Sequence, residues 1–218
     1  MKIYINALTV NSIKILLLCN ALKIKVDFEL IALNKGEQRE AAFLAINPEG
    51  KVPVLVDDEL TLTESNAILH YLGAKVNSHL WPATLIEQAK VLRILFWQSN
   101  YFNSGVAPFA HRKVVMPFWG FDFPDIEANQ MTKYNHALSA LESILTENKF
   151  VSGNSMTIAD ISLVAFFIFA KQANMPLQTY PLVQAWLKNI SKQHWFIETK
   201  QSLIASLTSE HSNQHFNQ

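Results

Sequence analysis

The architecture of the N-terminal half follows from residues 47–72, NPEGKVPVLVDDELTLTESNAILHYL, in which two β-rich segments lead into an amphipathic helix. The segments meet at Asp57-Asp58, a turn signal that predicts a hairpin of two antiparallel strands. Apolar residues at positions 67, 68, 71 and 72, followed by Gly73, predict a helix that ends soon after. Residues 47–72 therefore predict a ββα unit.

The sequence upstream of this unit predicts two further strands and two helices. Residues 2–6 and 26–33 have the pattern of strands, whereas residues 13–22 form an apolar run too long for a typical strand and predict a buried helix. Residues 34–48 hold a short helix that must end before Pro48, because proline disfavours helix at the preceding residue. The order βαβαββα predicts one small mixed sheet, with a parallel pair, an antiparallel hairpin and helices on its faces.

Strand signals disappear after a linker at about residues 76–84. Helical patterns cover residues 86–102, 128–149, 157–175 and 180–193, and a bend rich in proline and aromatic residues lies at 117–125. We therefore expect an α/β domain over residues 1–76, an all-helical domain over 85–206 and a frayed polar tail over 207–218.

The helix that begins near residue 157 carries its own start signal. Thr157-Ile-Ala-Asp160 places a hydroxyl at the N-cap and a carboxylate three residues later, which is a capping box with Asp in place of the usual Glu. Its expected role is structural, because it starts an almost wholly apolar helix without leaving backbone donors unsatisfied.

Composition excludes several classes of protein. Half of the 218 residues are hydrophobic and 17% are charged, which excludes a disordered chain. Lys+Arg and Asp+Glu both number 18, so no basic excess indicates a nucleic-acid partner. The single cysteine, Cys19, excludes an internal disulfide and a multi-cysteine metal site, and its apolar surroundings predict an inert thiol. We expect no metal cofactor, because no histidine pair has metal-ligand spacing.

Targeting and membrane signals are also missing. The longest apolar run, residues 161–170, falls well short of the ~20 residues that a membrane span needs. The N-terminus has no signal-peptide pattern, so we expect a cytoplasmic protein without membrane partners.

The turn after the first strand is the first candidate site. Thr9, Asn11 and Ser12 lie at the N-terminus of the buried helix, where free N–H groups and partial positive charge favour an anion such as a thiolate. The alternative is ordinary helix capping by Asn11 or Ser12.

Two further candidates lie on either side of the hairpin. Pro53 marks a strand edge or a cis bond, and either leaves the backbone of Val52 free to pair with an extended, peptide-like ligand. Ser65, at the start of the next helix, is placed to bind a ligand carboxylate while Glu64 binds an ammonium group. The alternatives are a simple strand start and simple capping.

Aromatic residues gather between positions 109 and 123, where prolines interrupt the helical pattern. We expect most of them to be core, and some to line an apolar pocket for a hydrophobic substrate. The residues chosen for this pocket are Phe109, His111, Phe118 and Trp119.

These residues together resemble one family. The βαβαββα order, NPEGKVPVL at 47–55, LTESNAILHYL at 62–72 and the capping box look like a cytosolic glutathione transferase, over nearly the whole chain. The resemblance implies a thioredoxin-like N-terminal domain, an all-helical C-terminal domain and a homodimer. It also implies a glutathione site on the first domain and a site for a hydrophobic co-substrate between the two domains.

The resemblance assigns roles to individual positions. Val52, before a cis Pro53, would pair its backbone with the cysteinyl part of glutathione, and Glu64 and Ser65 would hold the γ-glutamyl end. Lys51 and Gln38 would meet the glycyl carboxylate.

Different stretches of the sequence resemble two different subclasses of the family, theta and nu. Theta-class enzymes have a serine where Thr9 stands, and LTLTESNAIL and HRKVVMP look theta-like. The run TVNSIKI instead resembles the nu-class bacterial proteins, which have Thr and Asn at the positions of Thr9 and Asn11 and act mainly as glutathione-dependent disulfide reductases. The function that the resemblance implies is conjugation of glutathione to small hydrophobic electrophiles, as in detoxification. The alternatives are glutathione-dependent disulfide or peroxide reduction and, second, a non-enzymatic binding or regulatory role.

Overall fold

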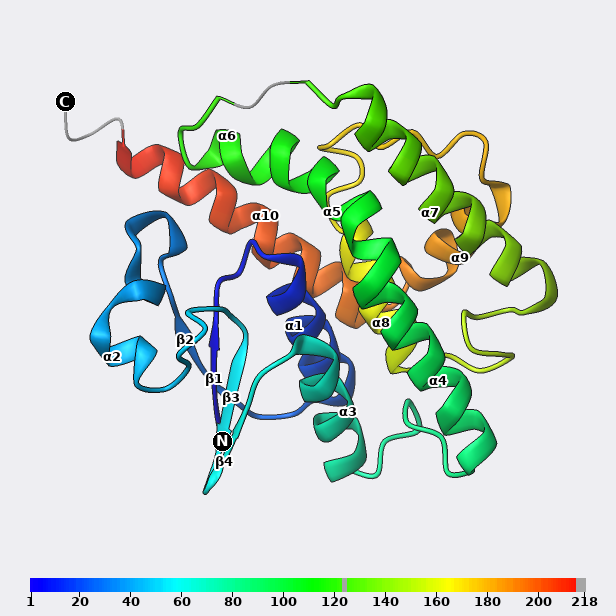
Figure 1. The fold of residues 1–218 in the computed structure, drawn as a ribbon, viewed down its shortest axis with the longest axis horizontal. Helices are drawn as coiled ribbons and strands as arrows, with labels where there is room; N and C mark the ends of the chain where they lie inside the picture. Colours follow the sequence, from blue (N-terminus) through cyan, green and yellow to red (C-terminus); the bar gives the residue numbers. More distant parts are fainter. Residues whose placement is uncertain (123–124, 215–218) are drawn as a thin grey trace.

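The computed structural model describes residues 1–122 and 125–214, without the side chains of 208–214. The N-terminal domain is built on a four-stranded sheet in the order β2-β1-β3-β4 (Figure 1). Its strands are β1 (Lys2–Ile5), β2 (Asp27–Leu30), β3 (Val54–Asp57) and β4 (Leu60–Leu62). The sheet is mixed, as the sequence predicts: β1 and β2 are parallel, and the other two pairs are antiparallel.

Alternate residues of the strands face two different cores. Ile3, Ile5 and Leu55 join the main core with α1 (Val10–Leu22) and α3 (Ser65–Lys75). On the other face Tyr4 and Val54 join a small core beside α2 (Ala41–Leu44), which two short 3₁₀ segments, η1 (Leu33–Lys35) and η2 (Glu37–Arg39), precede. The period of two along each strand thus divides the domain into an inner face covered by α1 and α3 and an outer face covered by α2 and the segments around it.

One long, bent helix opens the second domain. Its parts are α4 (Leu85–Trp97), the π-helical η3 (Gln98–Phe102), α5 (Asn103–Ala110), the π-helical η4 (His111–Val115) and α6 (Met116–Phe118). The prediction that this helix ends at residue 102 is wrong. Pro108 precedes one wide π-helical turn and Pro117 follows it, so the helix widens and bends around the prolines instead of ending.

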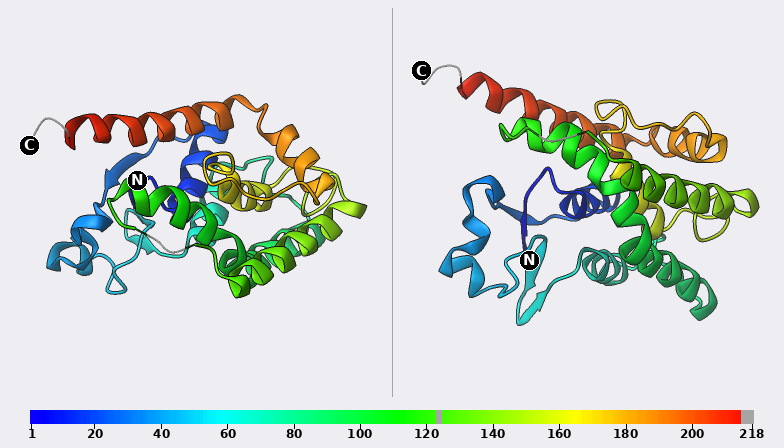
Figure 2. Two further views of the ribbon diagram at one scale, coloured as in Figure 1. Left: turned by 90° about the horizontal axis from the view of Figure 1, so that it is seen from above. Right: turned by 45° about the horizontal axis from the view of Figure 1, so that its top comes forward.

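The remaining helices are α7 (Ala128–Glu147), α8 (Ile158–Val164), the short 3₁₀ segment η5 (Ala165–Phe167), α9 (Pro181–Ile190) and α10 (His194–Gln214). In Figures 1 and 2, α10 runs along one side of the molecule above α1, which it contacts. The frayed tail expected from residue 207 is helical as far as Gln214, and residues 215–218 lie outside the described part of the chain.

The helix α1 joins the two domains. It contacts α3 within its own domain and α8, η5 and α10 in the helical domain. Leu17, Leu18 and Cys19 are among its many buried side chains, so most of its circumference is enclosed. Its N-terminus is therefore fixed from both sides, which suits a site that needs exact positioning.

The predicted capping box is present at the start of α8. Thr157 is the N-cap, and the Asp160 carboxylate accepts from the Thr157 N–H at 2.9 Å. The fully buried carboxylate also accepts from the Val151 N–H at 3.1 Å and the Trp186 indole N–H at 3.0 Å. Burial raises the pKa of Asp160 to about 6, although these donors favour its ionised form. No helix in the described ranges has both the length and the hydrophobicity to cross a membrane.

Candidate functional site

A cavity of about 450 Å³ opens between the N-terminus of α1 and the helical domain. Leu8, Thr9, Val10 and Ile13 form its wall on the first domain. The wall on the second domain comes from the bent helix and from the segment around η5: Asn103, Ser104, Ala107, Pro108, Ala110, His111, Arg112, Val115, Ala165, Phe166 and Phe169. This interdomain pocket is mainly apolar, and Thr9 brings a hydroxyl to its edge.

Thr9 is the N-cap of α1. It has extended backbone angles, and its Oγ1 accepts from the Ser12 N–H at 3.4 Å, so a long capping contact is present. The same hydroxyl lies 3.1 Å from the Asn6 carbonyl oxygen and 2.8 Å from the Ser12 Oγ. A hydroxyl has one proton, so it donates to one of these acceptors at a time and is free to turn toward an anion in the pocket.

The structure separates Ser12 from Asn11. Ser12 is fully buried, and its Oγ accepts from the Asn6 N–H at 3.2 Å, so it supports Thr9 from behind and does not reach the pocket. Asn11 is only partly buried, and its Oδ1 accepts from the Ser65 hydroxyl at 3.2 Å. Within the described residues its Nδ2 has no hydrogen-bond partner, so Asn11 offers an amide donor that the fold does not use.

The contact between Asn11 and Ser65 joins two candidate places that are 54 residues apart in the sequence. Ser65 is the first residue of α3 and is nearly buried, while Glu64 before it is exposed. Glu64 has φ +64° and ψ 110°, a backbone conformation that L-residues rarely adopt. Such strain is concentrated at functional sites, so its position here supports a role in ligand binding.

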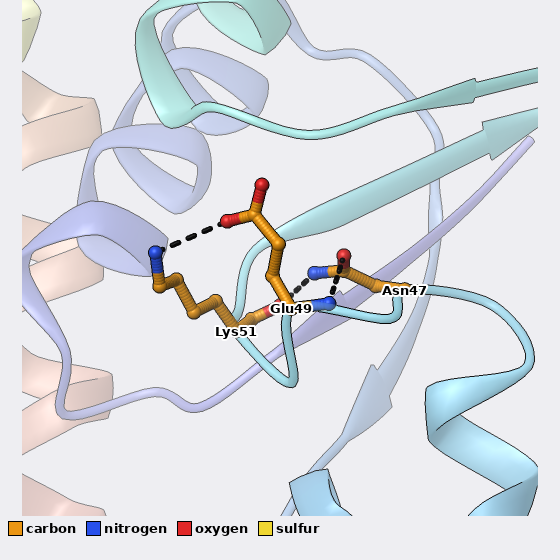
Figure 3. A network of polar contacts seen from close by, with 3 residues as sticks. All are labelled: Asn47, Glu49 and Lys51. Atoms are coloured by element: carbon orange, nitrogen blue, oxygen red, sulfur yellow. Dashed lines mark hydrogen bonds and ion pairs between the residues drawn. The ribbon is translucent and has the colours of Figure 1, made fainter.

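The loop before β3 has a free main-chain edge. The Val52-Pro53 peptide bond is cis, as the resemblance implies. In the described chain the N–H and C=O of Val52 have no hydrogen-bond partner. Figure 3 shows how Asn47 holds this loop: its Nδ2 donates to the Lys51 carbonyl at 2.8 Å, and its Oδ1 accepts from the Glu49 N–H at 3.1 Å.

Lys51 and Gln38 lie on two loops that meet at Gly50. The Lys51 ammonium forms an exposed ion pair with Glu49 at 3.0 Å, which contributes little and is easily exchanged for a ligand carboxylate. Gly50 has φ +61°, and a Cβ there would lie 2.9 Å from the Gln38 carbonyl oxygen, so only glycine allows the two loops to approach so closely. The Oε1 of Gln38 is buried without a hydrogen-bond partner.

The residues predicted for the substrate pocket separate into three environments. His111 lies at the interdomain pocket. Phe109 does not: it is buried in the core, with its ring 4.2 Å from that of Tyr134. Phe118 and Trp119 line a smaller neighbouring cavity against the first domain. The bent helix turns these side chains away from the interdomain pocket because it continues past Pro108, and Phe123 lies outside the described residues.

Sequence reasoning missed the floor of the interdomain pocket. Phe166 and Phe169 come from the apolar run 161–170, which reads as core and is indeed almost entirely buried. Arg112 was missed on the opposite wall, beside His111. Burial of part of the His111 ring and the charge of Arg112 lower the pKa of His111, which favours the neutral imidazole. Pro108 was one of the signals that could have drawn attention to Arg112, because it marks an irregular helical segment.

A buried lysine was also missed. Lys14, in the second turn of α1, is only 1% exposed, and its Nζ lies 3.3 Å from the Ser65 Oγ. Nothing in the apolar run around it distinguishes it from a lysine on a solvated helix face.

Comparison with known proteins identifies the family. Residues 1–74 match the family model "Glutathione S-transferase, N-terminal domain", and residues 106–194 match "Glutathione S-transferase, C-terminal domain". Glutathione S-transferase T1 of Arabidopsis thaliana is 32% identical over 204 residues, which are 88% of this chain and 83% of that protein. The chain belongs to the glutathione S-transferase family and is an enzyme of that family.

Solved structures agree with this fold. Glutathione transferase F7 from Populus trichocarpa is 26% identical, with a TM-score of 0.83 over 93% of this chain and 98% of its own. Human glutathione transferase theta-2, solved as a complex with glutathione and an unknown ligand, is 24% identical and shares the fold with a TM-score of 0.83, over 95% of this chain and 87% of its own.

Proposed function

We propose that the protein binds glutathione along the edge of the first domain and joins it through its sulfur to a small hydrophobic electrophile in the interdomain pocket. The observation that carries the proposal is the continuity of the site: the apolar pocket opens at Thr9, and the next turn residue, Asn11, is hydrogen-bonded to Ser65. One extended ligand can therefore contact Ser65 at one end and the pocket at its thiol.

The remaining contacts follow the length of the ligand. The unpaired main chain of Val52 would pair with the cysteinyl part of glutathione, as an added β-strand does. Glu64 and Ser65 would hold the γ-glutamyl end, where the carboxylate of Glu64 meets the ammonium group. Lys51 and the buried Oε1 of Gln38 would meet the glycyl end.

The chemistry needs a thiolate. A thiol with a pKa near 8.5 is mostly protonated at neutral pH. Donors from Thr9 and Asn11, together with the free N–H groups at the start of α1, favour the thiolate and lower that pKa. The thiolate then attacks an electrophilic carbon held against Phe166 and Phe169. The new S–C bond replaces the bond from that carbon to its leaving group, which departs as an anion such as chloride. The protein supplies position and anion stabilisation, while the ligand supplies the nucleophile.

Reduction of disulfides or peroxides is the second candidate. The Asn11 Nδ2 group, which has no hydrogen-bond partner in the described residues, favours this function. It could stabilise the thiolate by a hydrogen bond even when no hydrophobic substrate occupies the apolar pocket. Cys19 takes no part in either reaction, since burial raises the pKa of its thiol to about 12.

One assay set distinguishes the functions. Binding to immobilised glutathione is measured first, followed by turnover with 1-chloro-2,4-dinitrobenzene and with bis(2-hydroxyethyl) disulfide. Turnover of the aromatic chloride supports conjugation, and turnover of the disulfide alone supports reduction. Absence of glutathione binding overturns both and leaves the binding or regulatory role. A cytoplasmic place in detoxification accords with conjugation of hydrophobic electrophiles.

We infer that the protein forms a homodimer through α4 and η3. These elements expose four large apolar side chains, Leu85, Ile86, Phe96 and Tyr101, with Phe96 and Tyr101 65% and 71% exposed. Large apolar side chains exposed along one helical segment are typical of a protein interface. Phe96→Glu is expected to shift the mass measured by light scattering from two chains to one, whereas Phe121→Glu, at another exposed aromatic, is the matched control and leaves it unchanged.

A further inference from the structure

The buried amine of Lys14 is the least expected feature of the molecule. A buried lysine is costly unless its charge is compensated, and the described residues include no carboxylate in a salt bridge with it. Its Nζ donates instead to three neutral acceptors: Gln98 Oε1 at 2.8 Å, Ser65 Oγ at 3.3 Å and Asn66 Oδ1 at 3.4 Å.

The three acceptors suit an ammonium group. A protonated lysine has three N–H donors, one for each oxygen. The same oxygens accept from other groups as well: Ser162 Oγ donates to Asn66 Oδ1 at 2.8 Å, and Asn66 Nδ2 donates to Gln98 Oε1 at 2.9 Å. The pocket around Nζ is thus built from acceptors, and the Phe166 ring completes it at 5.4 Å from the charge.

The charge of this ammonium group has no close counter-ion among the residues that the structure describes. Glu64 is the charged residue whose field reaches Lys14, and it is exposed. The groups that face Lys14 from the other elements packed against it are uncharged: Asn66 on α3, Gln98 on η3 and Phe166 on η5. Desolvation consequently lowers the pKa of Lys14 to about 7, and the charge of Glu64 only partly opposes this shift.

A ligand carboxylate at Ser65 would supply the missing charge, and it would accept the hydrogen bond that the Ser65 hydroxyl otherwise donates to Asn11 Oδ1. Lys14 and such a carboxylate would lie on opposite sides of one hydroxyl oxygen, roughly 6 Å apart when two hydrogen bonds are placed in series. We propose that Lys14 is the buried counter-charge for the carboxylate that binds at Ser65, so that this carboxylate binds most tightly while the amine holds its proton. The inference rests on the glutathione site proposed above and makes Lys14 a positioning residue within it.

As a consequence, ligand binding is expected to be coupled to protonation of Lys14. An opposite charge at about 4–6 Å raises the pKa of a lysine by one unit or more, and one unit corresponds to a tenfold difference in affinity between its two protonation states. Binding at pH 7.5 would then take up roughly half a proton on Lys14, and binding at pH 5.5 almost none, because the amine is already protonated.

The experiment is isothermal titration calorimetry with S-methylglutathione, which has no ionisable thiol. Titrations at pH 5.5 and 7.5 in buffers of different ionisation enthalpy count the protons taken up. The wild type is expected to show the uptake at pH 7.5, and Lys14→Met to show none at either pH. At pH 6 the Lys14→Met variant should bind about tenfold more weakly, a loss that shrinks as the pH approaches 9.

Two controls keep the result specific. Lys14→Arg, whose guanidinium stays protonated, should keep affinity at pH 6 and lose the proton uptake. With an analogue whose γ-glutamyl α-carboxylate is a primary amide, Lys14→Met should change affinity less than twofold. Thermal melts check that each variant folds, and the proton count of the wild type tests the inference even if neither variant does.

Two outcomes have different meanings. If the wild type binds S-methylglutathione without proton uptake at pH 7.5, or if Lys14→Met binds both ligands as tightly as the wild type at pH 6, the role of Lys14 is overturned and the glutathione site stands. If the wild type binds neither S-methylglutathione nor glutathione, the proposed function itself is overturned.

Discussion

Two helices of this molecule, α1 and α8, begin in the same way and are used differently. Each has a threonine N-cap with extended backbone, Thr9 in α1 and Thr157 in α8. The third helical residue is Ser12 in α1 and Asp160 in α8. The first turn of α1 contains no acidic side chain, while that of α8 contains a buried one.

The difference shows what each N-terminus is for. Partial positive charge at a helix start is stabilised by a nearby anion. In α8 the protein supplies this anion itself, and Thr157 is nearly enclosed. In α1 the protein supplies none, Thr9 lies at a pocket, and the second turn of the helix holds a buried base, Lys14. The partial positive charge at the start of α8 is therefore balanced by Asp160, whereas that at the start of α1 is free to stabilise a bound anion.

The largest expected effect is on stability, and it comes from removing the Asp160 carboxylate at the start of α8. Asp160→Ala leaves the Val151 and Thr157 N–H groups and the Trp186 indole N–H without their acceptor, so it should cost about 4 kcal/mol of unfolding free energy. Urea denaturation measures this cost. Glu147→Ala, at an exposed carboxylate of α7, is the control and should change stability by under about 0.5 kcal/mol. An equal loss in both variants would contradict the structural role of the capping box.

The buried base of α1 should be visible in the pH dependence of stability. The unfolded chain keeps the Lys14 proton to a pKa of about 10.5, whereas the folded chain releases it at about 7, so stability rises with pH between these values. Relative to Lys14→Met, the wild type should gain about 2 kcal/mol from pH 7 to 9. Denaturant titrations of both proteins across this range measure the gain, and parallel pH profiles would show that Lys14 does not titrate there.

Transferring the acid from one helix start to the other sharpens the comparison. Ser12→Asp places a carboxylate where α8 has Asp160, so it should repel the thiolate, raise the thiol pKa of bound glutathione by about one unit and lower turnover about tenfold at neutral pH. The thiol pKa is read from thiolate absorbance. Ser12→Asn has a similar size without the charge, and an equal loss in this variant would attribute the effect to packing.

The smallest effect is expected at Thr9. Thr9→Ala removes one donor to the sulfur, worth about 1 kcal/mol, so turnover should fall about fivefold while glutathione affinity changes less than twofold. Thr9→Ser keeps the hydroxyl and should retain turnover. Unchanged turnover in Thr9→Ala would remove Thr9 from the thiol site and favour the Asn11 amide, a role that Asn11→Ala then tests.

The features that local patterns determine were predictable. The order of strands and helices in the first domain and the capping box at Thr157 depend on neighbouring residues, and the structure confirms both. The positions of the site residues depended on contacts over long sequence distances. No local pattern places the Ser65 hydroxyl against Asn11, or buries Lys14 among three acceptors from α3 and η3.

The bent helix shows a second limit. A proline usually ends a helix, so Pro108 and Pro117 predicted an interruption. Instead, the chain forms a π-helical turn between the two prolines and stays helical through both. Phe109 lies before this turn and is in the core, whereas Phe118 lies after it and lines a neighbouring cavity.

The pocket floor has an evolutionary consequence. Phe166 and Phe169 follow directly on α8, whose start is fixed by Asp160, so the floor belongs to the same rigid segment as the capping box. Substitutions there disturb the packing of α1 as well as the pocket. The opposite wall, Ala107 to Val115, lies on a helix that already tolerates two prolines and wide turns. New substrate ranges are therefore expected to arise by drift in this wall while the floor is inherited unchanged.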